Sequence, residues 1–371
     1  MHYQDYPRTR VSLDDMEITV EQALGSLFDH GAEWDQLLAI SPANTIFLTS
    51  GWLRAWAETY GQGANLLIPQ IRHNGKLIGA AAFQQRNGII KFAGAGPSDY
   101  MDLVLSSSLD HSTASSIIEA LLLAAQNAAT RFRFFWLERV PLENGTLAWL
   151  RAAGSRYYAT SIGSVFAPSM DMWAAAEKLK KKSLRRHERA FEREGKVQTD
   201  TFTQPHEILP RLDEFFDQHL RRWQDTPDPS LFKQETSRAF YRALTRNLDQ
   251  TGWLRFTNVR LNGHLAAAHF GFFYAGRFIW YKPTYEPTLA KHSPGEVLLK
   301  RLIERAQTDN ASELDFTIGE EAFKYRFATK TREVVTLHIT DSPLRAWMRR
   351  ARSAMGKMLR RVLGSTPRSP L

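Results

Sequence analysis

The 371-residue sequence contains no cysteine. This absence excludes disulfides, thiolate zinc sites and cysteine nucleophiles, so any group transfer must be direct or use another nucleophile. No run of eighteen apolar residues occurs, and residues 1–10 carry no apolar signal-peptide core behind their charges. We therefore expect a cytoplasmic protein. Metal-ligand patterns such as His-Glu-x-x-His are missing too, and we expect no metal.

Acidic residues are missing from the end of the chain. Residues 342–371 include eight basic residues and no acidic one, while the whole chain has a formal net charge of +9. Nine minus eight leaves +1 for the remainder, so the basicity belongs to this tail and we expect no specific nucleic-acid partner. Apolar residues recur in the tail at helical spacing, which predicts a basic amphipathic helix in peripheral contact with the inner face of an anionic membrane. A helix packed back on the protein and a tail that contacts RNA are the alternatives.

The rest of the chain contains an internal duplication. Residues 66–80 align with residues 254–268 at an offset of 188 without a gap, and both read as strand, Asn-Gly turn, strand. The offset then drops to 181, and the helical run 117–126 matches 298–307. Each half predicts helix, hairpin, strand, helix, strand, which is an α/β fold in duplicate with mixed sheets flanked by helices. The predicted boundaries are 1–168 for the first half, 169–341 for the second half and 342–371 for the basic helical tail.

The two halves differ at the helix that follows the third strand. In the second half this helix opens with His-Ser-Pro-Gly-Glu-Val, residues 292–297, where Ser293 suits the N-cap and Pro294 the first helical position. Glu296 would complete a capping box, and Gly295 would let a ligand approach the backbone closely. Such a helix start binds pyrophosphate through free amide hydrogens and the helix dipole, although an ordinary capped helix is the alternative. The first half has neither glycine nor proline at this point, so a phosphorylated cofactor belongs in the second half. The predicted cofactor-binding residues are His292, Ser293, Pro294, Gly295 and Glu296.

Residues 314–327, Leu-Asp-Phe-Thr-Ile-Gly-Glu-Glu-Ala-Phe-Lys-Tyr-Arg-Phe, follow that Ser-Pro-Gly turn. This arrangement resembles the signature of the CelD-like acyltransferases, which belong to the GNAT superfamily and are related to the FemAB peptidyltransferases. The segments 47–53, 98–102 and 178–193 also look like their counterparts in this family. The resemblance covers roughly residues 40–335 and comprises several motifs in order.

The resemblance implies a tandem GNAT fold with a degenerate first half and the coenzyme site in the second. It implies acetyl-CoA or another acyl-CoA as co-substrate and transfer of the acyl group to an amine or hydroxyl. A small-molecule or glycan-type acceptor in polysaccharide or cell-envelope metabolism is a family-level expectation only. Phe323 stands where the family has a tyrosine, so no role of that hydroxyl is carried over. A FemAB-like aminoacyl transferase that uses charged tRNA and a non-catalytic membrane or assembly adaptor are the alternatives.

Acyl transfer needs a base for the acceptor proton, donors for the developing oxyanion and an acid for the leaving thiolate. Asp315, on the predicted strand 314–318, is the preferred base, and Glu286, just past the preceding strand, is the second choice. The alternative for Asp315 is that it caps the following turn or pairs with Lys324 or Arg326.

Tyr325 begins a predicted short helix and is our candidate for protonating the thiolate, with a core aromatic as the alternative. Lys324 and Arg326 are candidates for an anionic acceptor or for cofactor phosphates, with solvated helix charges as the alternative. The predicted substrate-binding residues are Lys324, Arg326, Asp99, Tyr100 and Tyr285.

A basic helix is predicted at the start of the second half. Nine basic and three acidic residues lie between Lys178 and Lys196, and apolar residues at helical spacing give this segment one apolar face. A solvated helix is the plain interpretation, and attraction of an anionic acceptor is the sharper one.

Overall fold

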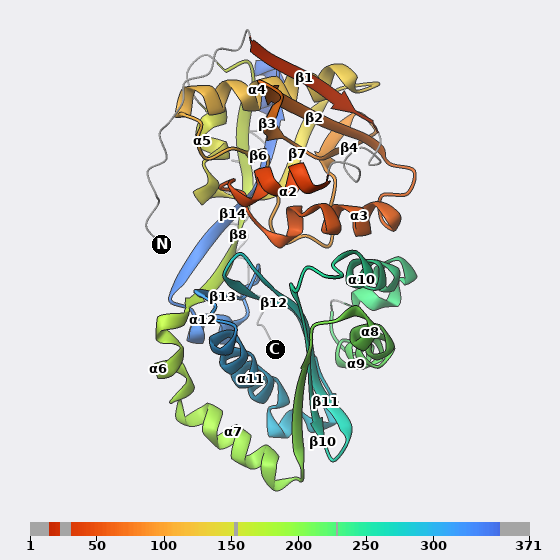
Figure 1. The fold of residues 1–371 in the computed structure, drawn as a ribbon, viewed down its shortest axis with the longest axis vertical. Coiled ribbons are helices and arrows are strands. Elements are labelled where there is room, and N and C mark those ends of the chain that lie inside the picture. Colours follow the sequence, from red (N-terminus) through yellow and green to blue (C-terminus); the bar gives the residue numbers. More distant parts are fainter. Residues whose placement is uncertain (1–14, 23–30, 152–154, 228, 349–371) are drawn as a thin grey trace. The chain divides into compact units, whose positions relative to one another are not determined.

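The computed structural model describes residues 15–22, 31–151, 155–227 and 229–348. The chain forms two compact units: unit 1 comprises residues 1–53, 61–166 and 332–371, and unit 2 comprises residues 54–60 and 167–331. Each unit has its own strands and helices, and each is described by itself (Figure 1).

Unit 1 is built on a mixed sheet. Its strands are β1 (Met16–Glu21), β2 (Asn65–His73), β3 (Lys76–Ala80), β4 (Phe83–Arg86), β5 (Ile89–Phe92), β6 (Val104–Leu105), β7 (Phe134–Pro141) and β14 (Lys330–Thr340). Its helices are α2 (Gly31–Ala39), α3 (Ser50–Glu58), α4 (His111–Ala128) and α5 (Thr146–Leu150), with short 3-10 turns at Ile46–Leu48 and Leu142–Asn144. The strand order is β6-β3-β2-β4-β5-β7-β14, and β1 pairs with β2. β5 and β7 run parallel because the chain crosses over through α4 between them.

Unit 2 repeats this plan. Its strands are β8 (Tyr158–Asp171), β9 (Val197–Phe202), β10 (Leu254–Leu261), β11 (His264–Tyr274), β12 (Arg277–Tyr285) and β13 (Glu313–Asp315). Its helices are α6 (Ala175–Leu179), α7 (Lys182–Arg193), α8 (Pro205–Ile208), α9 (Leu212–Arg222), α10 (Glu235–Asn247), α11 (Pro294–Thr308) and α12 (Ala322–Phe327). Its 3-10 turns are η4 (Met172–Ala174), η5 (Leu209–Arg211), η6 (Leu231–Lys233) and η7 (Pro287–His292). The strand order is β8-β13-β12-β11-β10-β9, and α11 forms the crossover between the parallel strands β12 and β13.

The predicted duplication is confirmed by details of the backbone. Both Asn-Gly turns, Asn74-Gly75 and Asn262-Gly263, have positive φ at both residues, as the type I′ hairpin turn requires. The register of each hairpin also shifts at the equivalent place, between Ile71 and Arg72 in unit 1 and between Val259 and Arg260 in unit 2. These paired positions are separated by the offset of 188 seen in the sequence.

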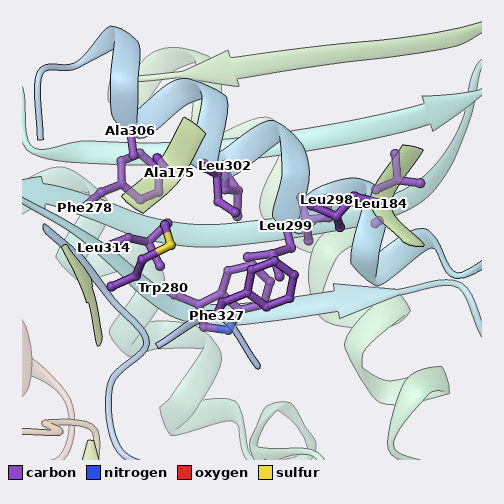
Figure 2. Close-up of a cluster of buried hydrophobic side chains, with 14 of the residues drawn as sticks. Ala175, Leu184, Phe278, Trp280, Leu298, Leu299, Leu302, Ala306, Leu314 and Phe327 are labelled. Atoms are coloured by element: carbon purple, nitrogen blue, oxygen red, sulfur yellow. The ribbon is translucent and has the colours of Figure 1, made fainter. Parts of the chain in front are cut away.

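The core of unit 2 lies between its sheet and the crossover helix. α11 buries Leu298, Leu299 and Leu302 against Phe278 and Trp280 of β12 (Figure 2). α6 and α7 pack on the outside of α11 through small or apolar residues such as Ala175, Leu184 and Phe191. α8, α9 and α10 cover the other face of the sheet (Figure 1).

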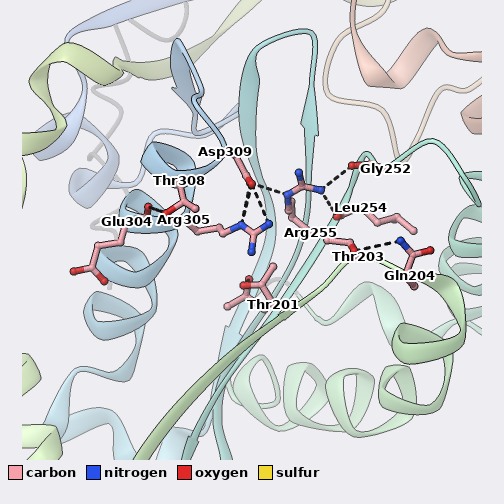
Figure 3. A network of polar contacts seen from close by, with 11 residues as sticks. Thr201, Thr203, Gln204, Gly252, Leu254, Arg255, Glu304, Arg305, Thr308 and Asp309 are labelled. Carbon is pink, nitrogen blue, oxygen red and sulfur yellow. Dashed lines mark hydrogen bonds and ion pairs between the residues drawn. The ribbon is translucent and has the colours of Figure 1, made fainter.

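A buried ion pair ties the end of α11 to the sheet. Arg255 of β10 donates from Nε to Asp309 at 2.7 Å, and Arg305 also contacts this carboxylate (Figure 3). Arg255 and Asp309 are each less than one-tenth exposed. Burial raises the pKa of Asp309, but the hydrogen bonds from Arg305 and Arg255 outweigh that effect and hold the pKa below its usual value.

Two sequence predictions about elements need correction. The helix predicted over 178–193 is two helices, because the chain turns at Lys180-Lys181 between α6 and α7. The strand predicted over 314–318 ends at Asp315, because the chain leaves the sheet through a turn at Thr317.

The tail predicted over 342–371 falls mostly outside the described residues. Residues 343–348 are helical, and the side chains of Leu344 and Trp347 are exposed. Within the described ranges, none of the helices has both the length and the apolarity needed to cross a membrane. Also within these ranges, no group of three or more histidine, aspartate or glutamate side chains could hold a metal ion.

Candidate active site

The parallel strands β12 and β13 of unit 2 separate near the middle of β12. Arg277, Phe278 and Ile279 pair with Glu313, Leu314 and Asp315, after which β13 ends while β12 continues to Tyr285. The Thr317 hydroxyl donates to the carbonyl of Trp280 at 3.3 Å, immediately beyond the last ladder pair. Beyond this point β13 offers no backbone partner to β12, so this edge of β12 can pair with an extended ligand.

A bulge bends β12 at the same level. The register of β11 against β12 shifts between Phe270 and Phe272, and the imidazole of His269 takes the space beside Gly271. A Cβ on Gly271 would lie 2.0 Å from Cε1 of His269, so only glycine fits there. His269 Nε2 accepts a hydrogen bond from the Tyr281 N–H at 3.1 Å. Burial lowers the pKa of His269 to about 3, so the ring stays neutral and acts as an acceptor.

The start of α11 differs from the predicted capping box. Pro294 is the first helical residue, as predicted, but Ser293 has a left-handed backbone (φ 54°) and its side chain caps nothing. Instead the Ser293 carbonyl accepts from the amides of Glu296 and Val297. The Glu296 carboxylate is held by Nδ1 of His187 at 2.9 Å and by the guanidinium of Arg326 at 2.7 Å, and these side chains take the place of the backbone amide in a capping box.

Gly295 therefore presents its backbone at an uncapped helix start. Among the described residues no hydrogen bond to its N–H is found. A Cβ here would make only an ordinary contact, 3.6 Å from Cδ1 of Tyr285. Tyr285 lies at the end of β12 with the guanidinium of Arg222 stacked 4.5 Å from its ring centre. The neighbouring His292 places Nδ1 3.4 Å from Glu194. The end of β12 and the start of α11 thus meet around Gly295.

Unit 1 fills the equivalent positions with its own groups. The Asp110 side chain accepts from the Thr113 amide at 2.8 Å and caps the N-terminus of α4. Where β5 and β7 diverge, the Met101 N–H donates to the carbonyl of Arg139, a β7 residue at φ 65°. Arg139 in turn binds the Asp99 carboxylate at 2.9 Å. In unit 1 the chain thus caps its own helix start and covers the edge of β7, the strand that corresponds to β13.

Asp99 and Tyr100, predicted to bind substrate, are both buried within unit 1. Besides the Arg139 pair of Asp99, the ring of Tyr100 meets Phe47 edge-on at 5.7 Å. Their contacts hold the loop between β5 and β6, and a role toward substrate stays a prediction.

The signature segment after β13 forms a tight turn. Asp315 is 1% exposed and accepts from the Thr317 N–H at 2.8 Å. Thr317 has φ 56°, a region that β-branched residues avoid, and it is held there by this bond and by its own bond to Trp280. The alternative interpretation of Asp315, that it caps the following turn, describes this geometry.

The buried side chain of Lys324 binds the backbone of this turn. Its side chain is 4% exposed, and Nζ donates to the Ile318 carbonyl at 2.8 Å and pairs with Glu321 at 3.0 Å. A Cβ on Gly319 would lie 2.5 Å from this Nζ, so the glycine of the signature is required by the lysine. Lys324 is therefore not the solvated helix charge that we considered, because its ammonium serves the backbone of the turn. Phe323 packs 5.7 Å from Trp280.

The remaining predicted residues lie at the surface. Tyr325 is 43% exposed, so it is not a core aromatic. Burial, followed by the negative charges of Glu320 and Glu321, raises the pKa of Tyr325 above its usual value. Glu286 follows β12 and pairs with Arg221 at 2.9 Å, and Arg326 is half exposed and pairs with Glu296.

Sequence reasoning missed several groups that organise this region. Thr317 bonds to Trp280 and His187 bonds to Glu296, partners that lie far away along the chain, whereas Asp110 bonds to the nearby Thr113 amide. Only the Asp110-Ser112 helix-start composition carried a signal, since aspartate is a preferred N-cap residue.

Comparison with known proteins supports this description of unit 2. The family profile of the acetyltransferase (GNAT) domain matches residues 178–325. No curated protein sequence matches the chain significantly.

Among solved structures, the chain is similar to FemX, with a TM-score of 0.61 and 11% identity over 86% of this chain and 98% of that one. It is also similar to the C-terminal domain of a proposed lysylphosphatidylglycerol synthetase from Agrobacterium fabrum (TM-score 0.55, 11% identity, 90% and 96% covered). A conserved protein from Bacteroides thetaiotaomicron VPI-5482 gives a TM-score of 0.54 at 13% identity, with 87% and 99% covered. At these identities the likeness concerns the fold alone. The chain has a tandem GNAT fold, two copies of a mixed sheet flanked by helices, in which the second copy matches the acetyltransferase domain.

Proposed function

We propose that this protein transfers an acyl group from an acyl-CoA to an amine or hydroxyl of an acceptor, with the coenzyme bound by unit 2. The observation that carries the proposal is the parting of β12 and β13 next to an α11 start that no side chain caps. An extended pantetheine arm has amides that can pair with the open edge of β12, and a pyrophosphate suits the start of α11.

The residues present fit such a ligand. Gly295 offers an N–H and no side chain, and Pro294 suits the first helical position because no intrahelical hydrogen bond needs its missing N–H. Unit 1 lacks both features, because Asp110 would repel a phosphate from α4 and the loop bound to Arg139 covers the strand edge. We therefore place the coenzyme in unit 2 only.

The geometry changes our preference for the base. The buried Asp315 carboxylate is engaged by the Thr317 amide, whereas the Glu286 side chain is partly exposed and follows directly after β12. We propose Glu286 as the base, with its carboxylate oriented by the ion pair with Arg221, and Asp315 as the residue that holds the turn. Tyr325 remains our candidate acid, since its exposed phenol is protonated at neutral pH and can donate to a thiolate.

Acetyl as the acyl group, a glycan-type acceptor and a CelD-like role in the cell envelope are finer parts of this proposal. They are supported by the signature of residues 314–327 and by the Ser-Pro-Gly helix start.

Titration calorimetry with acetyl-CoA tests the proposal. The wild-type protein should bind saturably. Gly295→Asp, which puts a carboxylate at the phosphate position, should weaken binding by at least about 100-fold. Gly295→Asn has the same shape without the charge and should lose much less. Both variants should fold, because a Cβ at Gly295 meets only ordinary contacts. If no acyl-CoA binds to wild-type protein the proposal is wrong, and a charged-tRNA donor or a non-catalytic role takes its place.

A further inference from the structure

The outer face of α7 carries a row of five basic side chains. They are Lys182, Arg185, Arg186, Arg189 and Arg193, and we call them the basic stripe. Their spacing of three, one, three and four residues places them within about 100° of arc and along about 16 Å of helix. All five are exposed, and in the described part of the chain none of them forms an ion pair with a carboxylate.

The stripe lies opposite the face that α7 buries. Leu184 and Phe191, about half a turn from the stripe, pack in the core against α11. The acidic Glu188 also turns inward and binds Lys300 and Arg301 of α11. The helix thus directs its one central carboxylate toward the protein and its arginines toward solvent.

The 3-10 turn η4, which precedes α6, carries an exposed aromatic residue. Trp173 in η4 is 80% exposed, while the adjacent Ala174 and Ala175 are buried against α11. Because α6 and α7 both pack on α11, their outer faces both turn away from it, along the margin of unit 2 (Figure 1). An indole so exposed has no packing role in the unit.

We infer that this outer face of α6 and α7 docks on an anionic lipid surface. Four to eight clustered Lys and Arg side chains on an amphipathic helix attract acidic phospholipid headgroups, and tryptophan favours the interface between headgroups and acyl chains. The flat layer of negatively charged headgroups on a membrane can contact all five cations of the stripe at once. Base recognition in RNA uses amides, hydroxyls and stacked aromatics among the cations, and the exposed residues of α7 are the five cations and Glu192, with none of these groups among them.

Vesicle co-sedimentation of the full-length protein tests this inference. The stripe variant carries Arg185→Glu, Arg186→Glu and Arg189→Glu. The control variant carries Lys76→Glu, Lys233→Glu and Arg246→Glu, three other exposed positions. Each variant lowers the formal net charge of +9 by six, to +3, so global charge is matched. Thermal unfolding confirms that both variants fold.

Wild-type protein should bind vesicles of phosphatidylcholine with phosphatidylglycerol and not vesicles of phosphatidylcholine alone. Each basic residue is worth about fivefold in partition coefficient, so the stripe variant should lose at least about 100-fold and the control less than about fivefold. Trp173→Ser, which leaves the charge unchanged, should lose a few-fold, and added salt should weaken all binding.

Three outcomes would overturn the inference. Equal losses in the stripe and control variants would mean that only net charge matters. Undiminished vesicle binding by the stripe variant would assign the contact to another segment, such as the basic tail. Loss of binding to poly(U) RNA in the stripe variant, with vesicle binding intact, would make the face an RNA surface. None of these results depends on acyl-CoA binding, so the inference and the proposed function fail separately.

Discussion

Substitution of Asp315 tests most directly whether a residue of the site is catalytic or positions the backbone. Its carboxylate is buried and accepts the Thr317 amide, and Thr317 is held at φ 56° just where β12 and β13 part. If Asp315 holds this turn, an oxygen acceptor is what matters. If Asp315 is the base, its charge and proton affinity matter.

Asp315→Asn and Asp315→Ala distinguish these roles. Asparagine keeps an oxygen for the Thr317 N–H, so we expect it to cost about 1 kcal/mol of unfolding free energy or less. Alanine leaves a buried N–H unpaired, which costs about 1–3 kcal/mol, and it removes support from a backbone conformation that itself costs about 1–2 kcal/mol. Urea unfolding should therefore rank wild type, Asn and Ala in this order, with Ala about 2–4 kcal/mol below wild type.

The functional readouts should follow the same order. Acetyl-CoA affinity, measured by calorimetry, should be nearly unchanged in Asp315→Asn and clearly weakened in Asp315→Ala, because a loosened turn no longer fixes the point where the strands part. Release of the CoA thiol should also survive in Asp315→Asn, whereas Glu286→Gln should lower it about 100-fold or more. A fully folded Asp315→Asn protein that binds acetyl-CoA normally but has lost turnover would refute this reasoning and restore Asp315 as the base.

Three further predictions concern stability. Asp309→Ala leaves Arg255 buried without its carboxylate and should lower the free energy of unfolding in urea by about 3 kcal/mol. Because the pKa of Asp309 is depressed, its contribution to wild-type stability is present above about pH 4 and is lost as pH falls through the folded-state pKa. Burial raises the pKa of Asp102 to about 6 despite hydrogen bonds from Thr146 and Asn144, so this carboxyl destabilises unit 1 increasingly as pH rises from about 4 to 6. Asp102→Asn should remove this loss of unfolding free energy, about 3 kcal/mol over that pH range. Asp110→Ala should lower the free energy of unfolding by about 1 kcal/mol because it removes the α4 cap. Ser293→Ala should change it little, since the Ser293 side chain caps nothing. An equal effect of the two substitutions would contradict the assigned caps.

Much of the fold was predictable because it depends on local signals. The Asn-Gly turns require positive φ, and the alternating apolar residues on either side define hairpins whose register the turns fix. The proline at the start of α11 also had a single plausible place. These elements are decided by a few neighbouring residues, and the sequence analysis placed them correctly.

The side-chain roles in the site were harder because they depend on distant partners. Glu296 looked like half of a capping box, but His187 and Arg326 reach it from α7 and α12. Lys324 is predicted from the sequence to bind an anionic acceptor or cofactor phosphates, with a solvated helix charge as the alternative, yet its buried ammonium contacts the Ile318 carbonyl and Glu321. Spacing along the chain shows which groups are available, and competition among charged partners in three dimensions decides which bonds form.

The two copies share one fold, but they differ in what binds the backbone at the start of the crossover helix. In unit 1 a carboxylate from the chain caps α4, and a loop fastened by Arg139 closes the edge of β7, so the chain satisfies its own backbone. In unit 2 Ser293 adopts φ 54° and its side chain makes no cap hydrogen bond, and β13 ends at Asp315 while β12 continues to Tyr285. Leaving these groups open costs stability unless a ligand supplies the missing anion and strand. The strained Ser293 and Thr317 backbones, one at the helix start and one where the strands part, are therefore the features that argue most directly for a ligand in unit 2.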